Sequence, residues 1–190
     1  QYDSTTTYGS IAADFIAENT PRRRKTTIRG YNNALKHILP TFDNVPLSAI
    51  TEKMLVLWQN GLLAADLSDV YIHKIDTMFR TIYKYGAKRC GLQENPFDGV
   101  EKIGKACNKS LNFWTYEQYC AFIAHIKQPI TRTAFQVLYY CGIRIGELFA
   151  LTAGDIDVDA HIMHITKSLQ RMERQDVITP PKTQKGIRDI

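Results

Sequence analysis

Residues 138–151, LYYCGIRIGELFAL, give the sharpest indication of fold and function in this 190-residue chain. Gly142 ends one helical apolar pattern and Glu147 lies in the next, so Arg144 falls in a tight corner between two predicted helices. An arginine within apolar sequence needs an anionic partner, and Glu147, three residues later, can supply it. The residues alone leave two interpretations open: a structural ion pair, or a guanidinium held for an external anion.

Beyond this corner the apolar period changes from helical to alternating. Residues 161–165 (HIMHI) and 176–179 (DVIT) predict two strands, and residues 185–190 (KGIRDI) begin a third. Before the corner, Thr115 caps one predicted helix, and residues 131–141 form another in which Tyr139 and Tyr140 are expected to be core residues. Residues 113–190 therefore predict helices followed by a three-stranded β region.

The first hundred residues are predicted to be helical. Four amphipathic patterns indicate four helices, of which the second ends at Pro40. Thr51 is the expected N-cap of the third helix, and Ser68 or Asp69 that of the fourth. The turn-rich break at residues 93–99 is followed by lysines and few large apolar groups, as in a basic linker. The predicted organisation is a helical domain at 1–100, a linker at 101–112 and a second domain at 113–190.

Positive charge is modest in total, 24 Lys and Arg against 19 Asp and Glu, but it is clustered. Five cations in eight residues open the second predicted helix, where the helix dipole disfavours cations. A second group lies along one side of the fourth predicted helix at four-residue spacing, and a third group lies in the predicted linker. A phosphate backbone would relieve the repulsion, although a solvated polar face is the alternative. The candidate DNA-binding residues are Arg22, Arg23, Arg24, Lys25, Arg29, Arg80, Lys84, Lys88, Lys102, Lys105 and Lys109.

Other kinds of site find little support in the sequence. The four cysteines form no CxxC pair, and His161 and His164 would face opposite sides of a strand, so neither a metal site nor a cofactor is expected. No apolar run approaches the roughly 18–20 residues of a membrane helix. No signal peptide is visible, so a reducing intracellular compartment is expected.

The corner, followed by Leu151 and Asp155-Ile156-Asp157, resembles the first catalytic box of the tyrosine recombinases, or phage integrases. Residues 181–188, PKTQKGIR, are similar to that family's PKT…S-x-R-x-I strand, and the long insertion before them looks most like the integrases of conjugative transposons. The resemblance implies a mainly α fold with a small sheet: a helical SAM-like core-binding domain, then the first half of an α+β catalytic domain. It also implies a bacterial, cytoplasmic and nucleoid-associated protein.

The same resemblance implies an enzyme that integrates and excises a mobile element by cleaving and rejoining DNA through a 3′-phosphotyrosine. Arg144 would stabilise negative charge on the phosphate, with Glu147 as its support. Lys182 would protonate the departing 5′-oxygen, with Lys167 as the alternative. The implied partners are double-stranded DNA and further copies of the protein, which bind as dimers and assemble into tetramers.

Two boxes of that family have no match here. None of the five histidines begins a His-x-x-Arg motif, and none of the ten tyrosines is assigned as the nucleophile, so both boxes are expected beyond Ile190. A DNA-binding module or regulator without catalysis is therefore the alternative function. A helical interaction protein would leave the motifs of Arg144 and Lys182 unexplained.

Overall fold

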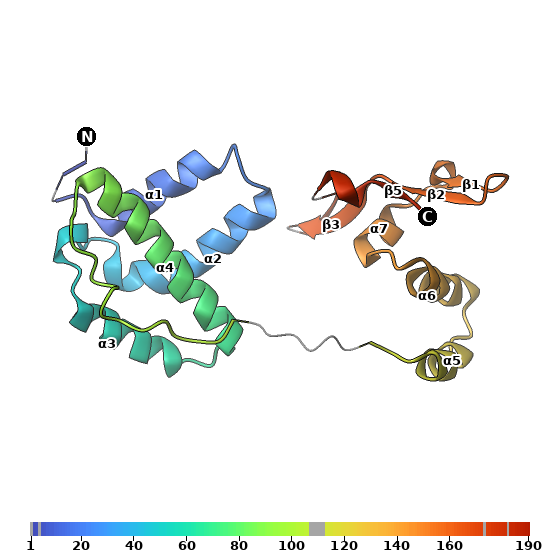
Figure 1. Cartoon of the computed structure of the whole chain (residues 1–190), viewed down its shortest axis with the longest axis horizontal. Coiled ribbons are helices and arrows are strands. Elements are labelled where there is room, and N and C mark those ends of the chain that lie inside the picture. The colour runs from blue at the N-terminus through green and yellow to red at the C-terminus, as the bar shows by residue number, and fades with distance from the viewer. Residues whose placement is uncertain (1, 4, 107–112, 173, 182) are drawn as a thin grey trace. The chain divides into compact units, whose positions relative to one another are not determined.

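The computed structural model describes residues 2–3, 5–106, 113–172, 174–181 and 183–190 (Figure 1). The chain divides into two compact units, Gln1–Ser110 and Leu111–Ile190. The fold is mainly helical with small antiparallel sheets, as the sequence predicted.

Four helices build the first unit. They are α1 (Tyr8–Asn19), α2 (Lys25–Phe42), α3 (Glu52–Leu63) and α4 (Asp69–Cys90), with a short 3₁₀ turn, η1 (Leu47–Ala49), before α3. The hydroxyl groups of Thr51 and Ser68 accept hydrogen bonds from the first turns of α3 and α4, so the caps expected there are confirmed.

The core of this unit is centred on Phe79 of α4, whose side chain is fully buried. Its ring centroid lies 4.8 Å from that of Tyr8, 4.7 Å from Phe42, 5.0 Å from Trp58 and 5.1 Å from Phe97. One side chain thus joins α1, α2, α3 and the turn after α4. Burial of large aromatic rings in one cluster explains why this unit holds together without a sheet.

The second helix continues past the predicted end at Pro40. It ends at Phe42, and the N–H of Asp43 still donates to the carbonyl of Leu39. A proline inside a helix removes one hydrogen bond, but Phe42 is fully buried against the core. Tertiary burial therefore outweighs the local preference for ending the helix.

Residues 101–105, the start of the predicted basic linker, pack on the first unit. The carbonyl of Glu101 accepts from Gln59 and Arg80, and that of Ile103 lies 3.3 Å from Nδ1 of His73. The N–H of Lys105 donates to the carbonyl of Asp69. This stretch lies along α3 and α4 because its backbone finds partners there, and Lys109 lies outside the described residues.

The second unit combines short helices with two small sheets. The helices are α5 (Tyr116–Ala124), α6 (Pro129–Cys141) and α7 (Ile145–Ala150), and 3₁₀ turns lie at η2 (Ala153–Asp155) and η3 (Gln184–Gly186). Strands β1 (Ile156–Asp157), β2 (Ile162–Ile165) and β5 (Arg188–Asp189) form one antiparallel sheet in the order β1-β2-β5. The insertion between β2 and β5 is a separate hairpin of β3 (Ser168–Met172) and β4 (Gln175–Thr179).

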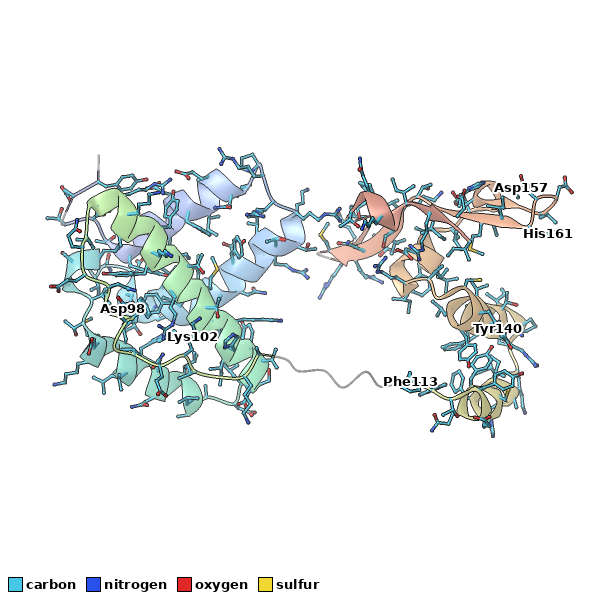
Figure 2. All side chains as sticks on the ribbon, in the orientation of Figure 1. Asp98, Lys102, Phe113, Tyr140, Asp157 and His161 are labelled. Carbon is cyan, nitrogen blue, oxygen red and sulfur yellow. The ribbon has the colours of Figure 1, made fainter. Side chains whose placement is uncertain are left out.

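Tyr139 and Tyr140 are not the core residues that the helical pattern predicted. Tyr140, labelled on α6 in Figure 2, is 64% exposed, and Tyr139 is 37% exposed. Their rings pack on Tyr119 of α5, with centroid distances of 3.7 Å for Tyr139 and 5.7 Å for Tyr140. The pattern identified the helix correctly but not the side of it that is covered.

Candidate phosphate-binding corner and nucleic-acid interface

The predicted corner is present in the second unit. Gly142 adopts the left-handed conformation, with φ of +60°, and ends α6, and Arg144 is the N-cap residue of α7. The side chain of Arg144 is 74% exposed, whereas that of Glu147 is 2% exposed. The corner therefore presents a guanidinium to solvent and buries the carboxylate that holds it.

The Glu147 carboxylate is held by two arginines. Oε1 accepts from Nη1 of Arg144 at 2.7 Å, and Oε2 accepts from the backbone N–H of Arg144 at 2.9 Å. Nη2 of Arg188, on β5, donates to Oε2 at 2.9 Å, and Nη1 lies 3.4 Å from Oε1. Burial acts to raise the pKa of Glu147, but the hydrogen bonds from Arg188 and Arg144 lower this pKa to about 2. Glu147 is thus an anion paired with Arg144, and its role as the support of a catalytic Arg144 stays a prediction.

Gly146 allows α7 to approach the insertion hairpin closely. A Cβ atom at this position would lie 2.6 Å from Oγ of Ser168 and 2.7 Å from the carbonyl oxygen of Leu169. Because a backbone oxygen cannot move aside, any other residue here would push α7 and its N-cap Arg144 away from β3. Gly146, the second glycine of the GIRIGE stretch, is therefore required by the packing of α7 against β3.

Of the two candidate lysines, Lys167 is described and Lys182 lies outside the described residues. Nζ of Lys167 lies 2.7 Å from Oδ2 of Asp155 and donates to Oγ1 of Thr152 at 3.1 Å. The hydrogen bonds from Lys167 and Thr152 lower the pKa of Asp155 to about 2. Lys167 is thus engaged in an ion pair that ties the start of β3 to η2, and which lysine is the general acid stays a prediction.

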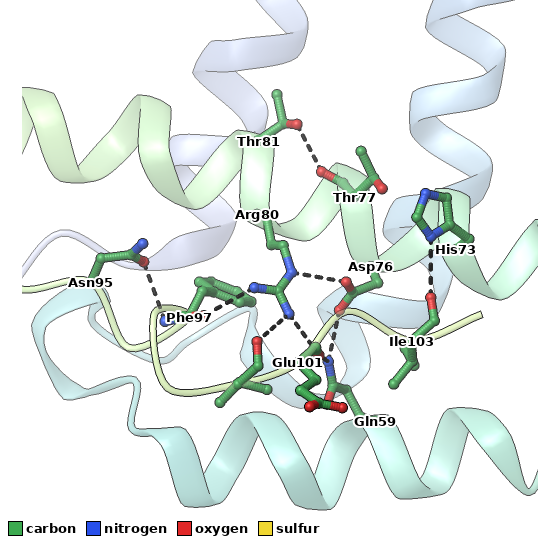
Figure 3. Close-up of polar contacts among 11 residues, drawn as sticks. Gln59, His73, Asp76, Thr77, Arg80, Thr81, Asn95, Phe97, Glu101 and Ile103 are labelled. Atoms are coloured by element: carbon green, nitrogen blue, oxygen red, sulfur yellow. Dashed lines mark hydrogen bonds and ion pairs between the residues drawn. The ribbon is translucent and has the colours of Figure 1, made fainter. Parts of the chain in front are cut away.

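Arg80 is not available for the phosphate contact that the sequence predicted. Its Nε donates to the buried carboxylate of Asp76 at 2.8 Å, and its Nη atoms donate to the carbonyls of Phe97, Val100 and Glu101 (Figure 3). The side chain is 16% exposed and its guanidinium lies over the ring of Phe97. Arg80 instead holds residues 97–101 on α4, because the buried charge of Asp76 requires a partner.

A different stripe of α4 carries the exposed polar groups. Lys84 and Lys88 are exposed, and the exposed residues that continue their line toward the start of α4 are Thr81, Thr77 and Lys74. In Figure 3, Thr77 and Thr81 lie along α4 apart from Asp76, which faces Arg80 and Gln59. Beside this stripe is a groove of about 560 Å³ lined from α2 by residues including Thr26, Thr27 and Asn33.

This groove lies next to the cations at the start of α2. Arg22, Arg23, Lys25 and Arg29 are exposed, and Arg24 is half-buried. Helix α2 contains no acidic residue, and the acidic residues of α4 are Asp69 at its start and the buried Asp76. The polar face of α2 and α4 is therefore basic and rich in hydroxyl and amide groups.

Of the predicted linker lysines, Lys102, labelled in Figure 2, is exposed, and Lys105 lies 3.9 Å from the carboxylate of Asp69.

Sequence reasoning missed two features of these sites. Arg188 was part of a quoted motif, but its pairing with Glu147 joins residues 41 positions apart, so only the fold reveals it. Lys74, Thr77 and Thr81 continue the line of Lys84 and Lys88 in steps of three and four residues, which is a signal that the sequence does contain. Among the described residues, no group of His, Cys, Asp and Glu could hold a metal ion, and no helix in that part of the chain is long and apolar enough to cross a membrane.

Comparisons with known proteins point to one family. Residues 7–63 match the N-terminal SAM-like domain of phage integrases. The chain is 29% identical to the ICEBs1 integrase of Bacillus subtilis (strain 168) over 82% of its own length and 42% of that protein. It is 25% identical to the prophage integrase IntR of Escherichia coli (strain K12), over 92% of the chain and 43% of IntR.

Solved integrase structures share the fold. The Tn1549 transposon integrase in complex with transposon right end DNA matches with a TM-score of 0.75 and 20% identity, over 97% of this chain and 60% of that one. A lambda integrase dimer bound to a COC′ core site matches with a TM-score of 0.67 and 17% identity, over 94% and 49%.

The domain match over residues 7–63, the integrase relatives and the shared fold together support a tyrosine recombinase, the family of the phage integrases. This agrees with the resemblance seen in the sequence. The chain spans less than half the length of the curated relatives it matches.

Proposed function

We propose that this chain is the DNA-binding and arginine-bearing part of a site-specific recombinase that integrates and excises a mobile element of the conjugative-transposon type. The observation that carries the proposal is the exposed Arg144 guanidinium, held at its base by a buried carboxylate. The enzyme would cleave DNA through a 3′-phosphotyrosine and rejoin it to a new partner. It would act at the bacterial nucleoid as dimers that assemble into tetramers.

In this reaction the transition state carries negative charge on the non-bridging phosphate oxygens. A guanidinium suits that charge, because it stays protonated and donates several hydrogen bonds in a fixed plane. Glu147 occupies only one edge of Arg144, so most of its donors remain for the phosphate. A lysine, Lys182 or alternatively Lys167, would protonate the 5′-oxygen as it leaves.

The helical unit would supply affinity for the duplex. The exposed cations at the start of α2 and on α4 can contact phosphates, while the threonines and Asn33 of the groove can donate and accept hydrogen bonds at base edges. Arg80 has no part in this contact.

Covalent trapping on a nicked suicide substrate tests the catalytic role in the gene's complete product. Arg144→Ala is expected to abolish the protein–DNA adduct, since the guanidinium that stabilises the phosphate is lost. The matched control is Arg171→Ala, an exposed arginine of the insertion hairpin, which should trap DNA as the unmodified protein does. Normal trapping by Arg144→Ala would overturn the assigned role.

The alternative function, a DNA-binding module without catalysis, makes a separate prediction. It requires the 190-residue chain to bind duplex DNA with an affinity that falls steeply with salt, because phosphate contacts release counterions. Salt-dependent binding with no adduct in the complete product would favour the module. Absence of binding at low salt would exclude both functions.

A further inference from the structure

Two arginines share the carboxylate of Glu147, and one of them, Arg188, affects the candidate phosphate site indirectly, through this carboxylate. One buried anion is paired with two guanidinium cations, Arg144 from the same corner and Arg188 from β5. The corner therefore keeps a net positive charge after both ion pairs have formed. A single pair would leave the corner neutral.

The two arginines use the carboxylate differently. Arg144 donates one side-chain N–H and its backbone N–H, and its side chain is 74% exposed. Arg188 approaches both oxygens with its two Nη atoms, and its side chain is 29% exposed. Arg188 thus faces the carboxylate, whereas most of the Arg144 guanidinium faces solvent.

This division follows from the demands of a buried carboxylate. A carboxylate has several acceptor positions, and a buried anion is stabilised only when they are filled. Without Arg188, the open positions of Glu147 would be satisfied best by a two-pronged contact with Arg144, the preferred geometry of such pairs. That contact would turn the Arg144 guanidinium toward Glu147 and take donors away from an external anion.

Arg188 is placed for this task by the sheet. Arg188 is paired across the sheet with Ile165 of β2, which is almost fully buried, and the next pair joins Asp189 to His164. Two further backbone hydrogen bonds between Met163 and Ile190, at 2.7 and 3.0 Å, extend the pairing. The approach of Arg188 to Glu147 is therefore set by the strand.

We propose that Arg188 is a positioning residue for Arg144: by occupying the buried carboxylate of Glu147 from β5, it keeps the Arg144 guanidinium turned outward and free to bind a phosphate. The phosphate as ligand rests on the proposed function, but the positioning concerns this chain alone.

Side-chain NMR of the 190-residue chain tests the positioning without DNA. The carboxyl ¹³C signal of Glu147 and the Nε–H signal of Arg144 are followed against pH in the unmodified chain, Arg188→Ala and Arg188→Lys. In Arg188→Ala we expect the Glu147 titration midpoint to rise by about one pH unit and the Arg144 signal to shift toward that of a paired arginine. Arg188→Lys keeps the charge but loses the two-pronged contact, so both shifts should be smaller.

Arg171→Ala is the matched control, because Arg171 is an exposed arginine whose ion pair with Asp176 is 3.9 Å long. It should change neither signal. The proposal is overturned when Arg188→Ala leaves both signals where they are in the unmodified chain. If Arg188→Ala does not fold, unchanged signals in Arg188→Lys overturn the proposal instead.

Binding of inorganic phosphate, followed at the Arg144 signal, measures the consequence. Affinity should fall roughly threefold to tenfold in Arg188→Ala and less in Arg188→Lys, whereas a purely structural role predicts no change once the chain is folded. The NMR result and the suicide-substrate result are independent. If the Arg144 signal shifts in Arg188→Ala while Arg144→Ala still traps DNA normally, the proposed function is refuted and the role of Arg188 remains intact.

Discussion

The two units of this chain are stabilised in different ways. In the first, one fully buried ring, Phe79, touches aromatic side chains from three helices and a turn. In the second, several large apolar side chains are exposed, among them Phe149 at 63%, and the buried centre of the corner is a carboxylate held by two arginines. Apolar burial therefore orders the helical unit, whereas polar contacts order the corner that presents Arg144.

Replacing matched phenylalanines should give the largest difference between the units. Phe79→Ala is expected to lower the free energy of unfolding of the first unit by about 3–5 kcal/mol, because it leaves a cavity in the core. Phe149→Ala should change the second unit by less than about 1 kcal/mol. Each unit has one tryptophan, Trp58 and Trp114, so ¹⁹F-tryptophan NMR during denaturation follows them separately. Equal losses would contradict the difference between the units.

A buried charge in the helical unit provides the next test. Arg80→Ala removes the partner of Asp76, whose side chain is fully buried, and should destabilise the first unit by about 3–5 kcal/mol. Lys84→Ala, one turn later and exposed, should change stability by less than about 0.5 kcal/mol. Urea unfolding monitored at Trp58 measures both variants. A small effect of Arg80→Ala would make Arg80 a candidate DNA contact again.

Acid should weaken the second unit through Glu147. The folded pKa of Glu147, about 2, lies below its ordinary value of 4.5. The stabilisation is therefore fully present above about pH 4.5 and is lost as the pH falls toward 2, and it amounts to at most about 3 kcal/mol. Unfolding at Trp114 from pH 7 to 2 should show this loss, and Glu147→Gln should reduce it, leaving the smaller part that comes from the lowered pKa of Asp155. An unchanged pH profile in Glu147→Gln would mean that another group causes it.

The smallest expected effect concerns DNA affinity. Lys84→Ala should weaken duplex binding by the 190-residue chain about equally for all sequences and reduce the salt dependence by roughly one phosphate contact. Lys53→Ala, an exposed lysine on α3, is the matched control and should bind normally. Fluorescence anisotropy over a salt series measures both. Equal losses in the two variants would mean that total charge, rather than the face of α2 and α4, governs binding.

Much of the helical structure could be predicted from local patterns. The caps at Thr51 and Ser68 and the end of α6 at Gly142 depend on residues within one turn of each other. The patterns did not reveal which side of a helix is covered. Arg80 was grouped with Lys84 and Lys88 by spacing, yet the side chain turns toward Asp76 because that buried carboxylate needs a cation.

The sequence by itself determined the pairing of Arg144 with Glu147, because three residues across a helix start bring the two groups together. Only the tertiary structure decided that Arg188 joins them and that Arg80 is withdrawn from the surface. Both outcomes depend on the fold. Strand pairing brings Arg188 to Glu147, whereas Arg80 is drawn inward because Asp76, four residues before it, is buried and the carbonyls of residues 97–101 pack on α4. Local spacing encodes contacts within a turn, whereas a buried charge takes its further partners from wherever the fold supplies them.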